Sequence, residues 1–233
     1  MNLIRLASAI ALLHSCCLAS ENPIFMTDRV EVSQGESATL TWSWPSASQA
    51  YLSTAGLVAN AGSGSMEVRP KETTDYVLVI ETSSHETRIL SQRVVVKGAK
   101  GSSTEWPRNP FLPLAYEREY RVAKISLVRL ADRVRTLLSS FEVQQFSQER
   151  ETLVFVTGFS EKAELKRAGE PRRRAIQYRV ALSSFGSEPI QVKVSATIRW
   201  RGLIDNRWFP ETSNELYEKI VGTLGGQIAG SQP

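Results

Sequence analysis

Residues 190–200 read Ile-Gln-Val-Lys-Val-Ser-Ala-Thr-Ile-Arg-Trp, and this stretch decides the fold class of the C-terminal half. Its even-numbered positions are all apolar, and its odd-numbered positions are all polar or charged. Alternation with a period of two indicates a β-strand that buries one face. Residues 176–182, Ile-Gln-Tyr-Arg-Val-Ala-Leu, alternate in a similar way. We therefore expect two strands of a half-buried sheet.

A helical pattern precedes these strands. Apolar residues recur every three or four positions from Ile125 to Phe141, which predicts an amphipathic helix. Its charged residues are expected on the side that faces solvent: Arg129, Asp132, Arg133 and Arg135. A second helix is expected to begin at the capping-type sequence 212–215 and to bury apolar residues as far as Leu224.

With further strands near 116–122 and 153–156, the order of elements over residues 116–226 is β-α-β-β-β-α. This order predicts an α+β layer, in which an antiparallel sheet carries both helices on one face. The glycines at 222, 225 and 226 are expected to close the last helix, and residues 227–233 to form a flexible tail.

The N-terminal half, residues 21–97, has an all-β pattern. Residues 37–44 alternate between polar and apolar, whereas 76–80 and 94–96 are continuous apolar runs, as in strands deep in a core. Short strands separated by Ser- and Gly-rich turns predict a β-sandwich. The chain is therefore expected to be a multi-domain protein.

Two motifs in this half resemble bacterial immunoglobulin-like domains. Residues 35–42 match a Gly-Glu-Ser-x-Thr-Leu-x-Trp opening, and residues 70–76 match a Pro-x-x-Thr-Thr-x-Tyr entry to the sixth strand. The resemblance implies an Ig-like sandwich in which Tyr76 is the corner tyrosine. It implies little about function, since such modules serve as spacers, adhesins or docking surfaces.

The second half resembles domains of BamC-like envelope lipoproteins from residue 120 to residue 224. The likeness rests on residues 176–180, 191–194 and 215–220. It implies a helix-grip domain and residence in the cell envelope, and it identifies no partner.

A linker and a change of charge separate the two halves. Residues 98–115 combine Gly and Ser with three prolines, which is typical of a linker. Residues 21–101 carry a net charge of −2, and residues 102–233 carry +5, within a total of +4 for the whole chain. The basic character therefore belongs to the C-terminal half.

The first 20 residues have the pattern of a secretory signal peptide. Arg5 supplies a positive charge, residues 6–13 are largely apolar, and small residues precede Glu21. The apolar run is far shorter than the roughly 20 residues that span a bilayer. We therefore expect export, with the protein in the periplasm or cell envelope.

Two modes of processing remain open. Residues 13–16, Leu-His-Ser-Cys, resemble a bacterial lipobox, in which Cys16 is lipidated and tethers the protein to a membrane, such as the outer membrane. Alternatively, cleavage after Ala19 or Ser20 leaves a mature chain without cysteine. In either case, the mature domains have no disulfide and depend on their apolar cores.

Little in the mature sequence points to catalysis. His85 is its only histidine and lies in a polar stretch, and one histidine cannot build a zinc site. No strained nucleophile turn or Gly-rich phosphate loop occurs. The carboxylate pairs Glu117/Glu119 and Glu149/Glu151 are the remaining basis for a hydrolase, and exposed charge explains them more simply. We expect a non-enzyme without cofactor or metal.

A basic surface is the remaining signal. The strand alternation places four cations on the sheet face opposite the helices: Arg179, Lys193, Arg199 and Arg201. A neighbouring loop adds Arg172, Arg173 and Arg174. Such a face is a candidate docking platform for an envelope protein complex or an anionic envelope surface. The alternative is that the cations only keep the face soluble, and export argues against nucleic acid as a partner.

These observations favour an exported, non-catalytic scaffold or accessory docking subunit of the envelope. The alternative is a periplasmic lipid- or glycan-binding module with its ligand between the sheet and the long helix. The aromatic residues considered for that site are Tyr178, Trp200, Trp208 and Phe209.

Overall fold

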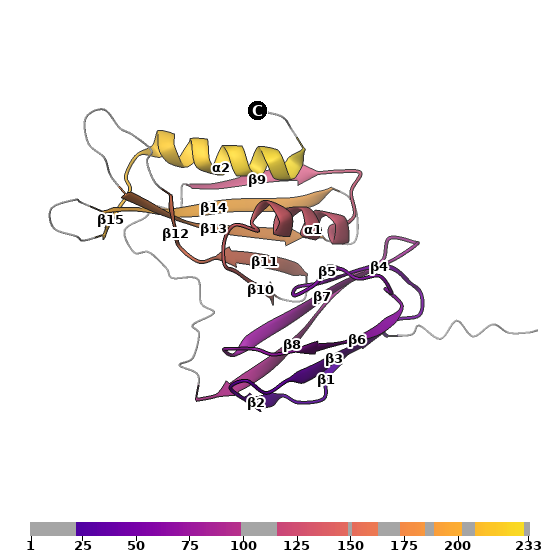
Figure 1. The fold of residues 1–233 in the computed structure, drawn as a ribbon. Coiled ribbons are helices and arrows are strands. Elements are labelled where there is room, and N and C mark those ends of the chain that lie inside the picture. The colour runs from indigo at the N-terminus through magenta and orange to yellow at the C-terminus, as the bar shows by residue number, and fades with distance from the viewer. Residues whose placement is uncertain are drawn as a thin grey trace, which may run out of the picture.

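A computed structural model describes residues 22–98, 116–148, 151–162, 173–184, 189–201 and 208–230. The predicted signal peptide with Cys16, and the predicted linker except for Gly98, lie outside these residues. The described part is a β-rich protein with two helices and three sheets (Figure 1).

Two sheets form the N-terminal unit, called the N-terminal sandwich below. Its strands are β1 (Ile24–Thr27), β2 (Glu31–Ser33), β3 (Ala38–Ser43), β4 (Ala47–Leu52), β5 (Gly56–Leu57), β6 (Ser63–Val68), β7 (Thr74–Thr82) and β8 (Thr87–Lys97). One sheet has the order β1-β3-β6, and the other has the order β2-β8-β7-β4-β5. Strand β2 runs parallel to β8. Leu40 and Trp42 of the first sheet share a buried core with Leu78 and Ile80 of the second.

The C-terminal unit, called the α+β unit below, contains one sheet and both helices. Its elements are β9 (Glu117–Val122), α1 (Leu127–Leu137), β10 (Val143–Gln148), β11 (Thr152–Thr157), β12 (Ser160–Lys162), β13 (Arg173–Ser183), β14 (Ile190–Arg201), β15 (Trp208–Pro210) and α2 (Asn214–Ala229). The central order is β10-β11-β13-β14, and β14 also pairs with β9 and β15 along its other edge. All the pairings are antiparallel.

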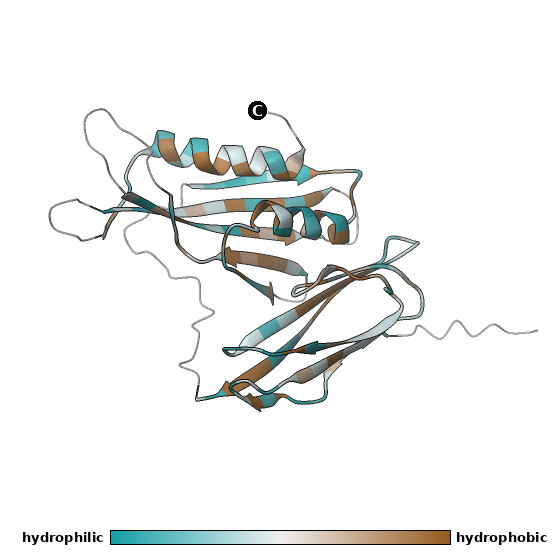
Figure 2. Cartoon of the chain, viewed as in Figure 1, coloured by the Kyte–Doolittle hydropathy of each residue, from teal (hydrophilic) through white to brown (hydrophobic). Residues whose placement is uncertain are grey.

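The alternation in residues 190–198 is confirmed, because its even-numbered side chains are buried in the core beneath the helices. They meet Val180 and Leu182 of β13 on the same face. In Figure 2, α2 alternates between apolar and polar along its length, whereas β11 is apolar almost throughout. Strand β11 is apolar on both faces because Leu153 faces the helices and Val154 is fully buried on the opposite face.

Three strands of the α+β unit were not predicted: β10, β12 and β15. Strand β10 reads Val-Gln-Gln-Phe-Ser-Gln and lies at the sheet edge, where few of its side chains need to be apolar. The predicted end of the domain at residue 226 is also wrong, since α2 continues to Ala229 and closes at Gly230, whose φ is 76°. Residues 227–229 are thus helical.

The glycines predicted to close the last helix lie inside it. At Gly225, a Cβ atom would overlap the ring of Tyr120 on β9. The absent side chain therefore lets α2 approach the sheet closely enough for the Tyr120 ring to lie between them. This close approach explains a glycine in a helix interior, where it costs about 1 kcal/mol relative to alanine.

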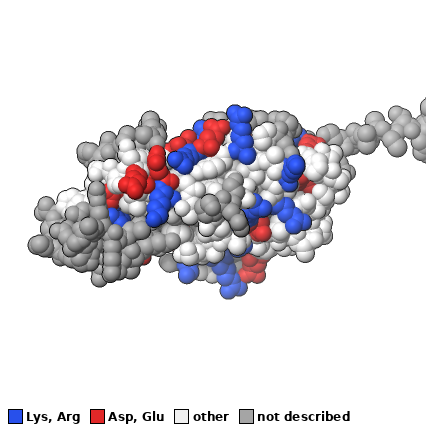
Figure 3. Space-filling model, turned by 90° about the horizontal axis from the view of Figure 1, so that it is seen from above, with Lys and Arg blue, Asp and Glu red and all other residues white. Residues whose placement is uncertain are grey.

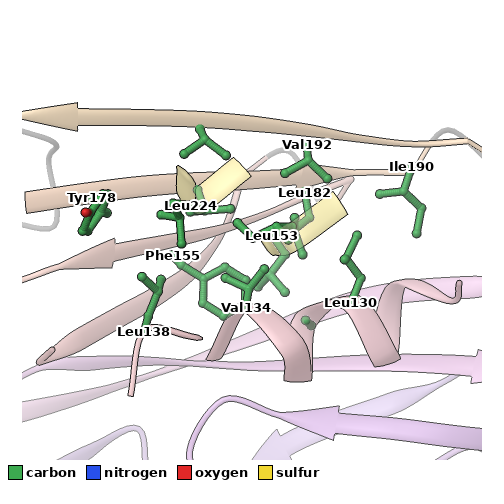
Figure 4. Packing of buried hydrophobic residues seen from close by; sticks show 14 of the residues in the cluster. Leu130, Val134, Leu138, Leu153, Phe155, Tyr178, Leu182, Ile190, Val192 and Leu224 are labelled. Atoms are coloured by element: carbon green, nitrogen blue, oxygen red, sulfur yellow. The ribbon is translucent and has the colours of Figure 1, made fainter. Parts of the chain in front are cut away.

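Helix α1 lies between the sheet of the α+β unit and the N-terminal sandwich (Figure 1). Leu130 and Val134 point toward the sheet residues Leu153 and Leu182 (Figure 4). The same core cluster continues into the sandwich through Tyr51, Val77, Val79 and Ile89. The two units are therefore joined by one continuous apolar core.

The shared core also accounts for the continuous apolar run in β7. Val77 and Val79 pack in the core that contains α1, whereas Leu78 and Ile80 pack inside the sandwich. Since both faces of the strand are covered, alternation is lost. A buried hydrogen bond of 2.8 Å from the Tyr51 hydroxyl to Gln145 Oε1 on β10 adds a polar link between the units.

Candidate functional site

The strand register confirms the predicted placement of four basic residues. Arg179 on β13 lies opposite Ser195, and Lys193 on β14 lies opposite Ala181. Arg199 and Arg201 follow Lys193 at even spacing on the same strand, so all four lie on the face away from the helices.

Arg174 does not belong to that face. It lies two residues before Ile176, whose side chain is in the core beneath the helices, and it is itself only 5% exposed. Its guanidinium forms an ion pair with the buried Glu211, with Nε and Oε2 3.3 Å apart. The prediction of Arg174 as a docking residue is therefore wrong, because a buried cation needs its own counter-charge.

Arg172 and Arg173 are the other two residues of the predicted basic loop. Arg172 lies outside the described residues. Arg173 begins β13 opposite Arg201, and only its position on the strand is described.

The basic sheet face, defined by Arg179, Lys193, Arg199 and Arg201, is partly neutralised and partly covered. Lys193 Nζ lies 3.4 Å from Glu117 Oε1. Arg199 stacks 4.5 Å from the centre of the Phe159 ring, and Arg179 donates to Gln148 Oε1. Burial lowers the pKa of Arg179. On the side of the molecule where α2 lies, cationic and acidic side chains are interspersed (Figure 3).

A second candidate site lies where the two units meet. We call it the interdomain cleft. It has a volume of about 650 Å³ and is lined by Gln49, Glu81, His85, Val122, Ala123, Lys124, Ile125, Ser126, Arg129, Arg133, Ala229 and Gly230. Its walls come from the sandwich, the β9–α1 connection, the polar side of α1 and the C-terminal end of α2.

The cations of α1 in this cleft are held in place by neutral acceptors. Arg129 Nε donates to Gln49 Oε1 at 3.1 Å, across the boundary between the units. Arg133 Nη1 donates to the carbonyl oxygen of Ile228 at 3.0 Å, near the end of α2. Within the described part of the chain, neither guanidinium has a carboxylate partner. The prediction that these arginines lie on the solvent-facing side of α1 is confirmed, since both are exposed, and each also donates a hydrogen bond to a neighbouring element.

A carboxylate–imidazole pair forms the opposite wall. His85 Nδ1 lies 2.9 Å from Glu81 Oε1, and the two side chains are 85% and 4% exposed. Glu81 Oε2 is buried and has no hydrogen-bond partner among the described residues. The sequence places His85 in an exposed turn, which the structure confirms, but the pairing was missed because it forms only when that turn folds back on β7.

Backbone strain occurs on both sides of the cleft. His85 and Lys124 have φ values of 65° and 61°, and they are the two non-glycine residues with positive φ in the described chain. Such conformations are sparsely populated for residues with a Cβ and often occur at ligand-binding segments.

The charges of the cleft suit anion binding. Among the described residues, no hydroxyl group is hydrogen-bonded to His85 Nε2. Guanidinium groups without carboxylate partners keep donors for an oxyanion.

The predicted ligand space between the sheet and the long helix is filled by core side chains (Figure 4). Tyr178 packs edge-on against Phe141, with ring centres 5.4 Å apart. Trp200 instead stacks on Phe209 at 4.6 Å, and the side chain of Trp208 is not described. Tyr178, Trp200 and Phe209 thus belong to two separate packing contacts rather than to one site.

Comparisons with known proteins do not assign a family. No family model and no curated protein matches the chain. A TBP-like protein from Parabacteroides distasonis is 10% identical, with a TM-score of 0.33, over 50% of this chain and 93% of that one. A DUF4468 family protein from Bacteroides ovatus is 13% identical, with a TM-score of 0.33, over 50% of this chain and 85% of that one.

Neither helix of the described residues combines the length and hydrophobicity needed to cross a membrane.

Proposed function

We propose that the protein is an exported, non-catalytic component of the bacterial cell envelope that docks onto a larger assembly as one rigid body. The observation that carries this proposal is the burial of α1 between the two units. Leu130, Ala131 and Val134 are fully buried in a core that both units share. A large apolar interface opposes relative domain motion, and a scaffold needs fixed spacing between its contact surfaces.

At the level of the modules, we propose an Ig-like sandwich followed by a helix-grip domain. Supporting the first, β2 runs parallel to β8 at one edge of the larger sheet. The predicted corner role of Tyr76 is not part of this support, since its hydroxyl makes no hydrogen bond within the described residues. Supporting the second, the sheet of the α+β unit is antiparallel, with β9 before α1 and α2 at the chain end.

The basic sheet face is the proposed docking surface. Arg174, which the sequence analysis included, is left out because it is buried. Lys193 is exposed, and Arg199 and Arg201 are half-buried on the same strand. The partner that this surface fits is an acidic protein surface or an anionic envelope polymer, since its charge complements the cations. Partly exposed cations of this kind contribute mainly to the association rate and the specificity of binding.

In-cell photo-crosslinking tests this proposal. A photoreactive residue in place of Ser195, beside Lys193, should yield one discrete adduct in the native host. The double variant Lys193→Glu/Arg199→Glu should lose the adduct, whereas Lys219→Glu, a charge reversal on the exposed side of α2, should keep it. An adduct that survives reversal of both basic residues would contradict docking through this face.

The mode of attachment has a separate test. The intact mass of the mature protein from the membrane fraction should match an N-acylated, diacylglyceryl Cys16 if the lipobox is used. A mass beginning at Ser20 or Glu21 would instead identify a soluble exported protein and favour the ligand-binding alternative. In that alternative, the interdomain cleft replaces the filled space beneath the helices as the binding site.

A further inference from the structure

We propose that the interdomain cleft binds a small phosphate monoester, with its phosphoryl group held by Arg129 and Arg133. This site is distinct from the basic sheet face and does not depend on the docking proposal. The argument rests on the charge, geometry and size of the cleft.

The lining charges call for an anion. The cleft brings together two cations without a carboxylate partner among the described residues, Arg129 and Arg133, and one carboxylate, Glu81, which pairs with His85. A phosphate monoester carries about two negative charges at neutral pH, which matches this excess of cations. Arg129 and Arg133 are also four residues apart on α1, a spacing at which like charges repel. A bound dianion would remove that repulsion.

The arginines are already oriented. Each guanidinium has five N–H donors, and one contact to a neutral acceptor fixes each of them here, Gln49 for Arg129 and the Ile228 carbonyl for Arg133. The remaining donors suit the several oxygens of a phosphoryl group. The C-terminal end of α2, which carries partial negative charge and disfavours an anion, also lies nearby. The hydrogen bond from Arg133 to the Ile228 carbonyl neutralises part of that charge.

The size and opposite wall of the cleft indicate an organic ligand rather than free phosphate. About 650 Å³ is within the range of small-molecule sites. Because Nδ1 of His85 pairs with the Glu81 carboxylate, the other ring nitrogen, Nε2, is left for a hydrogen bond with a ligand hydroxyl group. Val122 and Ile125 provide apolar contact for the carbon frame. These features fit a phosphorylated polyol, either free or as the headgroup of a phosphomonoester lipid.

Isothermal titration calorimetry on the full chain tests the site, with glycerol 3-phosphate as the free probe and glycerol as the phosphate-free control. We expect saturable binding of glycerol 3-phosphate alone. Arg129→Gln and Arg133→Gln should each weaken it about tenfold, since a hydrogen bond to a charged group contributes that much or more. Arg121→Gln, which removes an exposed arginine on β9 outside the cleft, should leave the affinity unchanged.

A second arm separates the two sources of phosphate. If vesicles containing phosphatidic acid bind and free glycerol 3-phosphate does not, and both cleft variants abolish vesicle binding, the site is assigned to a lipid headgroup. Amide chemical-shift changes at Ser126 and Gly230 of the unmodified protein provide a readout that needs no variant. Absence of binding by both probes, or equal binding by Arg129→Gln, Arg133→Gln and the unmodified chain, overturns the proposal.

Discussion

Replacing Tyr51 with Phe removes the hydroxyl that links the sandwich to β10, and its effect measures how tightly the two units are coupled. The hydroxyl donates to Gln145 Oε1 at 2.8 Å, and both residues are buried. A buried hydrogen bond contributes about 1 kcal/mol, and an acceptor left without a partner costs about 1–3 kcal/mol. Gln145 Nε2 keeps its 3.4 Å contact to the carbonyl oxygen of Ser53, so Tyr51→Phe leaves only Oε1 of this side chain without a partner. We therefore expect a loss of about 1.5–2 kcal/mol of unfolding free energy.

Urea denaturation measures this loss with two independent probes. Far-UV circular dichroism follows the helices, both of which lie in the α+β unit, and hydrogen exchange in β3 follows the sandwich. Since the units share a core, the transitions of the two probes should coincide, and Tyr51→Phe should move both to lower urea. In the double variant Tyr51→Phe/Gln145→Met, part of the stability should return, because the buried Gln145 acceptor is removed together with its donor, while the Ser53 carbonyl loses its long 3.4 Å contact.

Tyr76→Phe is the matched control. Tyr76 is 3% exposed, and no hydrogen bond of its hydroxyl to another described residue is present. Its replacement should therefore change the unfolding free energy by less than about 0.5 kcal/mol. The coupling argument fails if Tyr51→Phe is as neutral as Tyr76→Phe, or if it shifts the sandwich probe and leaves the helix probe unchanged.

Three further predictions concern the α+β unit. In thermal melts, Gly225→Ala should destabilise the protein by about 1 kcal/mol, because overpacking against the Tyr120 ring outweighs the gain in helix propensity. Gly222→Ala should instead stabilise it by up to about 1 kcal/mol, because the new Cβ atom meets only the flexible side chain of Arg118. Arg174→Met should cost about 3–5 kcal/mol in urea titrations, because it leaves Glu211 buried without its cation. Burial is the main cause that raises the pKa of Tyr217 to about 12, whereas the pKa of tyrosine in an unfolded chain is about 10. The buried neutral phenol therefore contributes stability that is fully present below pH 10 and is lost as the pH rises toward 12. Unfolding free energy should therefore fall between pH 10 and 12, and less steeply in Tyr217→Phe.

Each of these predictions has a contrary result. If Gly225→Ala stabilised the protein as Gly222→Ala does, α2 would be able to shift away from the sheet to accommodate the new side chain. A mild effect of Arg174→Met would mean that water or a nearby donor replaces the guanidinium. A flat stability profile between pH 10 and 12 would mean that Tyr217 ionises freely in the folded protein.

The elements with strong periodicity were predictable from the sequence. The alternation in residues 190–198 is confirmed because one face of β14 meets a core and the other does not. Strand β10 was missed because an edge strand made largely of Gln and Ser lacks that signal. The basic sheet face was placed correctly by the same alternation, and Arg174 was misassigned because it was grouped with its loop neighbours rather than with the even-numbered positions of β13.

The interdomain cleft was not predictable, since its walls come from segments far apart in the chain. Arg129 and Gln49 are 80 residues apart and meet only when the units dock. The helical pattern of α1 indicated which residues are charged, but a single amphipathic pattern cannot show that a second unit will cover part of the polar side. Tertiary packing therefore places part of the predicted solvent face along the wall of the cleft, where Arg129 and Arg133 remain exposed.

This origin has a thermodynamic consequence. A ligand in the cleft touches both units, because Glu81 and His85 belong to the sandwich while Arg129 and Arg133 belong to α1. Unfolding of either unit destroys the site, so a ligand stabilises the pair together by RT ln(1 + [L]/Kd), which is about 2.7 kcal/mol when the ligand is at 100 times Kd. The shared core and the cleft therefore reinforce each other: the core aligns the charges, and any anion that they bind strengthens the contact between the units.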